Sequence, residues 1–481
     1  MTANLVAALS TIIGIVAVSL TSRFRIGYLI SPFSVSILML VAIFGVRPLV
    51  IDYSAGPRLY QYATNDGVAE ATIVGLIAIL SVICGYCLVR NSRSPGPNVN
   101  EAQRSKKHLA ERMSRIPVGA MFYGCSAFVL LWVALMAFRG GGFDALIGMA
   151  GGRSSASSRI VENLPLIIYC LPAASALTAA SWRLVREREG MHLAAREKIV
   201  YWTVVIISLF PPLMLGNRRF ILPCVVAAVI AANVNQKRWN ARIKLHQLLL
   251  AALAFMLLAI VPFIRSSGSR NQGDSLLEAL ISFIQTEGLR GVLTNFFTSY
   301  DTEMLDYIAY VAPRLGTDVP YGLGRGTIED IFLAAIPTRI SGTASWSNEI
   351  LIELFGQPCG AGICPVPSFA GTAFFDFSYV GVVAIGVVVG AASKLFESAV
   401  FRAKGFGLIA VLILGALPAT AIRGNYPSQL WIAVNILVTA CVLVWILIQV
   451  SGRSKPSSKP VSRPAAITRE IDQRSYTLRK P

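Results

Sequence analysis

Long apolar runs constrain this chain more than any other feature of its sequence. Several reach the roughly 20 residues that an α-helix needs to cross a bilayer. Of the 481 residues, 54% are hydrophobic and only 14% are charged, whereas soluble domains carry about 25% charged residues. The sequence therefore predicts an all-α integral membrane protein with about 11 transmembrane helices, within a range of 10–12. Their approximate bounds are 4–20, 29–46, 70–89, 117–138, 164–182, 199–216, 220–235, 246–264, 377–393, 406–422 and 429–449.

The basic residues orient these spans. The loop 90–116 holds seven Lys and Arg residues, which places it in the cytoplasm by the positive-inside rule. Alternation of the spans then assigns 29 of the 43 basic residues, including every lysine, to the cytoplasmic side. We therefore predict a multi-pass membrane protein with its N-terminus on the outer side and its C-terminus in the cytoplasm. Because this arrangement accounts for the net charge of +18, membrane lipids are the expected contact and no nucleic acid is needed.

The spans divide the chain into four regions. Residues 1–264 hold helices 1–8, 265–376 form a large periplasmic loop, 377–450 hold helices 9–11, and 451–481 form a basic, disordered cytoplasmic tail. The periplasmic loop is acidic up to residue 375, with eleven Asp and Glu residues against six Arg and no Lys. Apolar residues at helical spacing over 275–312 predict amphipathic helices that lie on the membrane. Since a loop of this length is commonly functional, we expect the chemistry there.

Arginines at the outer ends of spans are the first candidates for a binding site. Arg218 and Arg219 lie between two apolar runs, and Arg423 follows a span directly. Arg325 and Arg339 belong to the large loop. A guanidinium can bind a phosphate through two parallel hydrogen bonds, so these residues could hold a lipid-linked phosphate or diphosphate. The alternative is that they anchor the protein to lipid headgroups.

Carboxylates near these arginines are candidates for a general base. Glu349 and Glu353 are four residues apart and share a face of a predicted helix, where repulsion between like charges raises a pKa. Asp376 enters the predicted span at 377, where an unpaired charge is costly. A solvated acidic face is the alternative for the glutamates.

The sequence gives little support for a periplasmic site that depends on histidine, a metal ion or a nucleotide. The three histidines, His108, His192 and His246, all fall in segments predicted to be cytoplasmic, so a periplasmic site would have none. No metal-ligand spacing and no nucleotide-binding GxxxxGK[ST] motif occurs. The sequence thus implies no metal and no cofactor. Cys359 and Cys364 lie in the large loop and could form a disulfide in the oxidising periplasm.

Three segments resemble the O-antigen polymerases of the Wzy type, also called oligosaccharide repeat unit polymerases. The first runs from Leu29-Ile30-Ser31-Pro32-Phe33 to Gly45-Val46-Arg47-Pro48-Leu49, and the second is Gly216-Asn217-Arg218-Arg219. The third extends from Ser347-Asn348-Glu349 through a Gly/Pro-rich loop to Phe375-Asp376-Phe377-Ser378-Tyr379-Val380-Gly381. The resemblance covers most of the chain as topology, although its motifs are short.

The resemblance implies a GT-C-like glycosyltransferase that works without a metal. Such an enzyme moves a growing glycan from undecaprenyl diphosphate to the next lipid-linked oligosaccharide repeat unit, at the periplasmic face. The resemblance thus implies a bacterial inner membrane protein, with its N-terminus in the periplasm. By the same resemblance, Arg218 or Arg219 would neutralise the leaving diphosphate, with Arg339 and Arg423 as further contacts, and Glu349 or Asp376 would accept the proton. The product would be an O-antigen, a capsule or an exopolysaccharide, and a chain-length regulator and a flippase are candidate partners.

Three other functions stay open. An O-antigen ligase shares the architecture but depends on a histidine in its large loop, which this chain lacks. A transferase that adds a single sugar would usually show an early pair of acidic residues. An exporter of polysaccharide or lipid-linked oligosaccharide would show internal repeats and ionisable residues within its spans.

Overall fold

The computed structural model describes most of the predicted spans and part of the large loop. The described residues are 2–51, 63–89, 109–140, 166–191, 193–214, 218–234, 236–245, 302–334, 346–355, 366–422 and 424–453, with a few single positions between 247 and 297. Within these ranges the secondary structure is helical, apart from two isolated β-bridges. The predicted all-α class is therefore confirmed.

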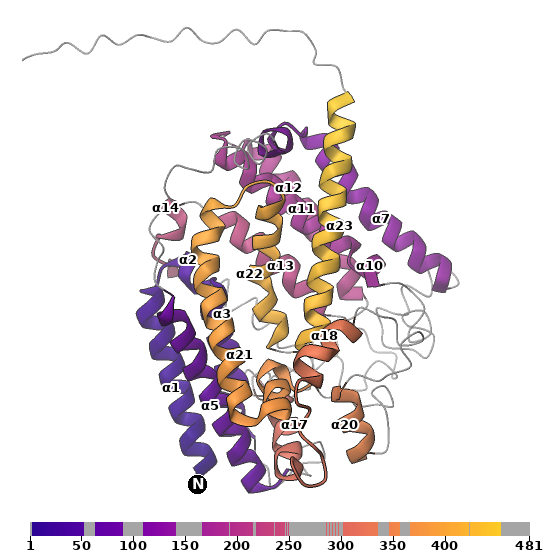
Figure 1. Ribbon diagram of the computed structural model, residues 1–481. Coiled ribbons are helices and arrows are strands. Elements are labelled where there is room, and N and C mark those ends of the chain that lie inside the picture. Colours follow the sequence, from indigo (N-terminus) through magenta and orange to yellow (C-terminus); the bar gives the residue numbers. More distant parts are fainter. Residues whose placement is uncertain are drawn as a thin grey trace, which may run out of the picture.

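One group of helices packs around a first hydrophobic core. Helix α3 continues through a π-helical turn, η1, into α4, so that a single segment runs from Pro32 to Val50. The group consists of α1 (Thr2–Ser22), α3 (Pro32–Leu40), η1 (Val41–Val46), α4 (Arg47–Val50), α5 (Asn65–Leu88) and α21 (Ser368–Arg402). Figure 1 shows α1 and α5 running side by side along the same edge of the molecule.

A second group surrounds helix α11. Every residue of α11 from Leu171 to Val185 is buried, and its Ala- and Ser-rich sequence lets neighbouring helices approach closely. The group consists of α7 (Val118–Gly140), α11 (Leu171–Arg188), α12 (Ala195–Met214), α13 (Arg218–Asn233), α22 (Phe406–Ala421) and α23 (Tyr426–Arg453). The predicted span at 164–182 thus corresponds to a central helix of the bundle, preceded by the short α10 (Leu166–Tyr169).

Shorter elements lie at the two ends of the bundle. Helices α17, α18 and α20 come from the large loop and gather at the end where α5, α21 and α23 begin, as Figure 1 shows. Helices α2 (Ile26–Leu29) and α14 (Gln236–Trp239) lie at the opposite end. The elements of the loop are α17 (Met304–Val311), η4 (Ala312–Arg314), η5 (Arg325–Glu329), α18 (Asp330–Leu333) and α20 (Trp346–Phe355).

Six described helices are long and apolar enough to cross a membrane. They are Ala3–Ser22, Pro32–Val50, Asn65–Leu88, Val118–Phe138, Ser368–Arg402 and Tyr426–Ser451, and each overlaps a predicted span. Two shorter apolar helices, Pro223–Asn233 and Phe406–Pro418, overlap two more. Helix α1 exposes large apolar side chains such as Leu5, Ile12 and Leu20, as a lipid-facing helix does. The predicted span at 246–264 and most of the tail at 451–481 lie outside the described residues.

The span expected at 377–393 is longer than predicted. Helix α21 begins nine residues earlier, at Ser368, and runs to Arg402. Its helical geometry is interrupted at Phe377 and Ser378, where Ser378 has φ 55°. The preceding turns, Ser368–Asp376, are buried. Asp376 therefore ends a buried helical segment rather than starting the span.

Close contact between α5 and α21 joins the start of the chain to its last third. A Cβ on Gly85 would lie 2.1 Å from the carbonyl oxygen of Val387, and one on Gly390 would lie 2.1 Å from that of Val82. Glycine at both positions lets the two backbones touch. Such small-residue contacts are how helices associate in membranes.

Helix α17 is the described end of the segment 275–312, for which amphipathic helices on the membrane are predicted, and it is buried within the protein instead; most of 275–301 lies outside the described residues. Each of its eight residues is buried. A Cβ on Gly67 of α5 would stand 2.1 Å from the carbonyl oxygen of Ala309, so the two helices pack backbone to backbone. The apolar periodicity of 304–311 predicts this helix. The sequence pattern does not show that Arg47 covers its buried polar residue, Asp306, as described below.

Candidate functional site

The large loop is fastened to the buried end of α21 by backbone hydrogen bonds. The N–H of Gly322 donates to the carbonyl oxygen of Phe375 at 3.1 Å. The carboxylate of Asp376 accepts from the N–H of Gly326 at 3.1 Å and from the N–H of Thr327 at 2.6 Å. Asp376 is fully buried. Its charge thus stabilises the first turn of η5, where backbone N–H groups lack helical partners.

A second buried carboxylate, Asp330, fastens α20 to the same place. Both of its oxygens accept from the N–H of Trp346, at 3.1 Å each, and the residue is 2% exposed. Burial raises the pKa of Asp330 from 3.8 to about 6, the N–H of Trp346 opposes the shift, and the nearby charges of Asp376, Glu329 and Glu349 add to it. Two carboxylates of this loop are therefore buried close together.

Arg325 and Glu349 form an ion pair beside these buried groups. Their Nη2 and Oε2 atoms are 2.6 Å apart, and the two side chains are 45% and 33% exposed. The guanidinium also lies 4.6 Å from the ring centre of Trp346 and 3.8 Å from the carboxylate of Glu329. An exposed pair of this kind contributes only about 0–1 kcal/mol to stability, so both partners can exchange it for a ligand.

The start of α23 packs on the same segment. The Tyr426 hydroxyl donates to the carbonyl oxygen of Thr327, and the Trp431 indole N–H donates to that of Ile331. We call the set formed by Arg325, Thr327, Asp330, Trp346, Glu349, Asp376 and Tyr426 the loop cluster. It combines residues from η5, α18, α20, α21 and α23.

Three residues beside the loop cluster have unusual backbone conformations. Leu323 has φ 50° and Gly324 has φ 102°, directly before η5, and Ser378 has φ 55° two residues after Asp376. A residue other than glycine in this region costs about 1–3 kcal/mol, and such residues gather at functional sites. The strain at Leu323 and Ser378 is consistent with a functional role of the loop cluster.

An ion pair that the sequence did not reveal anchors α17. Both Arg47 and Asp306 are 0% exposed, and the guanidinium bonds both oxygens of the carboxylate. Arg47 also donates to the Thr302 hydroxyl at 2.7 Å and to the carbonyl oxygen of Phe297. The sequence shows Arg47 as a charged residue between apolar ones. It does not show the partner, Asp306, which lies 259 residues further along the chain.

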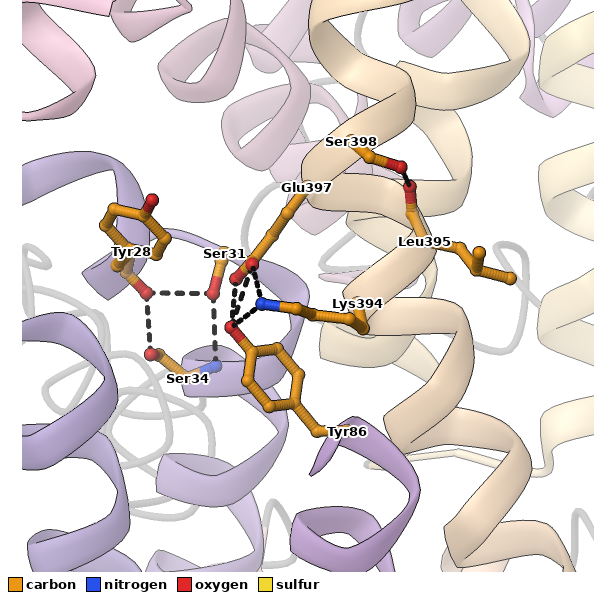
Figure 2. A network of polar contacts seen from close by, with 8 residues as sticks. All are labelled: Tyr28, Ser31, Ser34, Tyr86, Lys394, Leu395, Glu397 and Ser398. Atoms are coloured by element: carbon orange, nitrogen blue, oxygen red, sulfur yellow. Dashed lines mark hydrogen bonds and ion pairs between the residues drawn. The ribbon is translucent and has the colours of Figure 1, made fainter. Parts of the chain in front are cut away.

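The opposite end of the bundle holds a polar network of another kind (Figure 2). The Tyr86 hydroxyl donates to Glu397 at 2.8 Å, and the ammonium of Lys394 lies 3.2 Å from both groups. Nearby, the hydroxyls of Ser31 and Ser34 donate to the carbonyl oxygen of Tyr28. The network ties α3, α5 and α21 together, and we assign it a structural role.

The structure brings three of the seven predicted site residues together, namely Arg325, Glu349 and Asp376. Arg218 and Arg219 begin α13, after a short connection from the end of α12 at Met214, but their side chains lie outside the described part of the structure. Arg339, Arg423, Cys359 and Cys364 also lie outside the described residues. No group of three or more His, Cys, Asp or Glu residues suited to a metal ion occurs within the described ranges.

These observations define a helical, multi-pass membrane protein with a polar cluster where its large loop meets two helices of the bundle, α21 and α23. The family model for the O-antigen polysaccharide polymerase Wzy matches residues 1–454, and the chain belongs to this family. No curated protein and no solved structure matches the chain. The predicted family is thus confirmed. It makes the chain a polymerase of polysaccharide biosynthesis that acts on lipid-linked oligosaccharide repeat units in a bacterial inner membrane.

Proposed function

We propose that this chain joins repeat units carried on undecaprenyl diphosphate, at the periplasmic face of the membrane and without a metal ion. The family match supports polymerisation of O-antigen in general. The periplasmic placement rests on the distribution of basic residues, since all the lysines fall on the predicted cytoplasmic side. The loop cluster would then face the periplasm, where the finished repeat units are joined.

In the proposed reaction, a hydroxyl oxygen of the acceptor sugar attacks the anomeric carbon of the donor glycan. The new glycosidic bond forms as the bond from that carbon to the diphosphate oxygen breaks. The hydroxyl proton passes to a carboxylate, and undecaprenyl diphosphate leaves with additional negative charge. The protein must therefore supply a base and fixed positive charge where the leaving group develops its own.

The Arg325–Glu349 pair is the observation that carries this proposal. Binding of a diphosphate would draw the Arg325 guanidinium away from Glu349, because phosphate accepts the same forked pair of hydrogen bonds. Glu349 would then be released as a base only when the donor is bound. Arg218, Arg219, Arg339 and Arg423 are proposed as further contacts of the diphosphate.

Of the two carboxylates that the sequence left open, we favour Glu349 as the base. Its side chain is one-third exposed and can reach an acceptor. Asp376 is fully buried, and each of its oxygens already accepts a backbone hydrogen bond. We propose that Asp376 positions η5, and through it Arg325, without itself accepting a proton.

Complementation of a deletion strain tests the assignment of the base. Glu349→Gln should abolish the polysaccharide ladder and leave single repeat units on the cell surface. Glu353→Gln is the matched control, because it makes the same change one helical turn further along α20 at an exposed position, and it should keep the ladder. A normal ladder from Glu349→Gln would refute the role of this residue.

The same strain separates the remaining alternatives. A deletion that abolishes all attached glycan while long chains accumulate on the carrier lipid would indicate a ligase. An unchanged ladder in the deletion strain would exclude polymerisation and favour an exporter. In either case, the roles in polymerisation proposed for Arg325 and Glu349 would be refuted together with the proposed function. A chain-length regulator and a flippase are proposed partners of the polymerase.

A further inference from the structure

Several buried polar atoms of the loop cluster have no hydrogen-bond partner among the described residues. They include the indole N–H of Trp346 and the hydroxyl of Thr327, in residues that are 6% and 4% exposed. The side-chain oxygens of Asn425 and Gln429 have none either, and these two residues flank Tyr426, whose hydroxyl bonds Thr327. A buried group left without a partner costs about 1–3 kcal/mol, so native proteins keep few of them. Their concentration here suggests a ligand.

The Trp346 indole and the Asp376 carboxylate both pack directly against the backbone of Gly322 and Gly326. A Cβ on Gly322 would stand 2.0 Å from Oδ1 of Asp376 and 2.5 Å from Nε1 of Trp346. A Cβ on Gly326 would stand 3.0 Å from Cδ1 of the same indole and 3.3 Å from the same carboxylate oxygen. Any larger residue at position 322 would collide with both polar groups. The two glycines thus let the indole N–H and the carboxylate lie next to each other against the backbone of the loop.

The chemistry of the groups indicates what such a ligand offers. The groups are one indole donor and one hydroxyl, in residues whose backbone N–H groups bond Asp330 and Asp376, and two amide oxygens from residues on either side of Tyr426. Most of these groups accept hydrogen bonds, so the ligand must supply several donors and at least one acceptor. A sugar ring does so, since each hydroxyl both donates and accepts. A phosphate accepts hydrogen bonds without donating them, so it would leave the amide oxygens of Asn425 and Gln429 without a donor.

We propose that Trp346 and Thr327 form a subsite for the acceptor sugar, next to the base. Trp346 precedes Glu349 by three residues on α20, so the two side chains lie on neighbouring turns of one helix face. A sugar held by the indole N–H would present its hydroxyl to the Glu349 carboxylate. This inference rests on the proposed function, because it takes the acceptor to be a saccharide.

The test uses the full chain in lipid nanodiscs and a soluble probe. The probe is the oligosaccharide repeat unit released from its carrier lipid by mild acid, which lacks the diphosphate and so cannot act as a donor. Its dissociation constant is measured by saturation-transfer NMR. Trp346→Phe and Thr327→Val should each weaken binding about three- to tenfold, as expected for the loss of one hydrogen bond.

Matched controls make the same substitutions elsewhere. Trp445→Phe alters a half-exposed indole on α23, and Thr439→Val alters a buried hydroxyl that bonds within its own helix. Both should bind the probe as the wild type does. Equal binding by the wild type and the Trp346 and Thr327 variants would overturn the subsite, and so would a wild type that does not bind the probe.

Thermal unfolding without the probe supplies a second readout. Thr327→Val should leave the melting temperature unchanged or raise it, because it replaces a buried hydroxyl that has no partner among the described residues with a methyl group of similar size. A clear drop would show that the Thr327 hydroxyl already bonds within the folded protein and would overturn its part in the subsite. The polysaccharide ladder reports separately on polymerisation. If the binding test refutes the subsite but the deletion strain still needs this chain to form the ladder, the proposed function stands.

Discussion

The buried Arg47–Asp306 pair offers the sharpest test of how the large loop is held. Arg47→Met keeps much of the side-chain volume but removes the cation beside a carboxylate that is 0% exposed. It also removes the donors to Thr302 and to the Phe297 carbonyl oxygen. Breaking a buried ion pair from one side typically costs about 3–5 kcal/mol. We expect a loss of that size in the free energy of unfolding, measured by denaturant titration in mixed micelles.

The double variant Arg47→Met/Asp306→Asn distinguishes this reasoning from a simple packing defect. It removes both charges, so part of the lost stability should return, by about 1–3 kcal/mol relative to Arg47→Met alone. Arg314→Met is the control, since this arginine is only partly buried and bonds a carbonyl oxygen within its own turn. A loss below about 1 kcal/mol in Arg47→Met, or no recovery in the double variant, would refute the proposed anchoring of α17.

Two further predictions concern the loop cluster and the arginines of α13. Because burial raises the pKa of Asp330 from 3.8 to about 6, the folded protein retains this proton at pH values where the unfolded chain loses it. Stability should therefore fall by roughly 3 kcal/mol as the pH rises from about 4 to about 6. Thermal unfolding measured across that range should show a smaller decline for Asp330→Asn than for the wild type. An identical decline in both proteins would contradict the raised pKa of Asp330. Arg218→Lys should lose most of the polysaccharide ladder, by about tenfold or more, because an ammonium cannot make the forked contact with a diphosphate. A full ladder from a stably inserted Arg218→Lys protein would remove that role.

The sequence predicted the family and the class of fold because both depend on local patterns. Apolar runs of about 20 residues identify membrane-crossing helices without knowledge of their neighbours. The six candidate spans of the structure overlap predicted ones, and the family match confirms the resemblance found in three short motifs. The count of eleven spans and their orientation stay predictions.

The sequence also identified Asp376 as a costly charge, but it could not tell how that charge is satisfied. The donors are the backbone N–H groups of Gly326 and Thr327, about fifty residues earlier in the chain. Backbone donors leave no mark in the residue pattern. For the same reason the pattern could not distinguish a carboxylate that holds a turn, such as Asp376, from one that is accessible to substrate, such as Glu349.

Hydropathy and charge thus determined that this chain crosses a membrane and that its acidic loop meets the bundle at the ends of apolar helices. Only the tertiary structure decided which residues of that loop meet. It paired Arg47 with Asp306 and Arg325 with Glu349, and it buried Asp330 against Trp346. The physical reason is that burial in a membrane follows from the local sequence, whereas the partner of a buried charge is chosen by the packing of helices far apart along the chain.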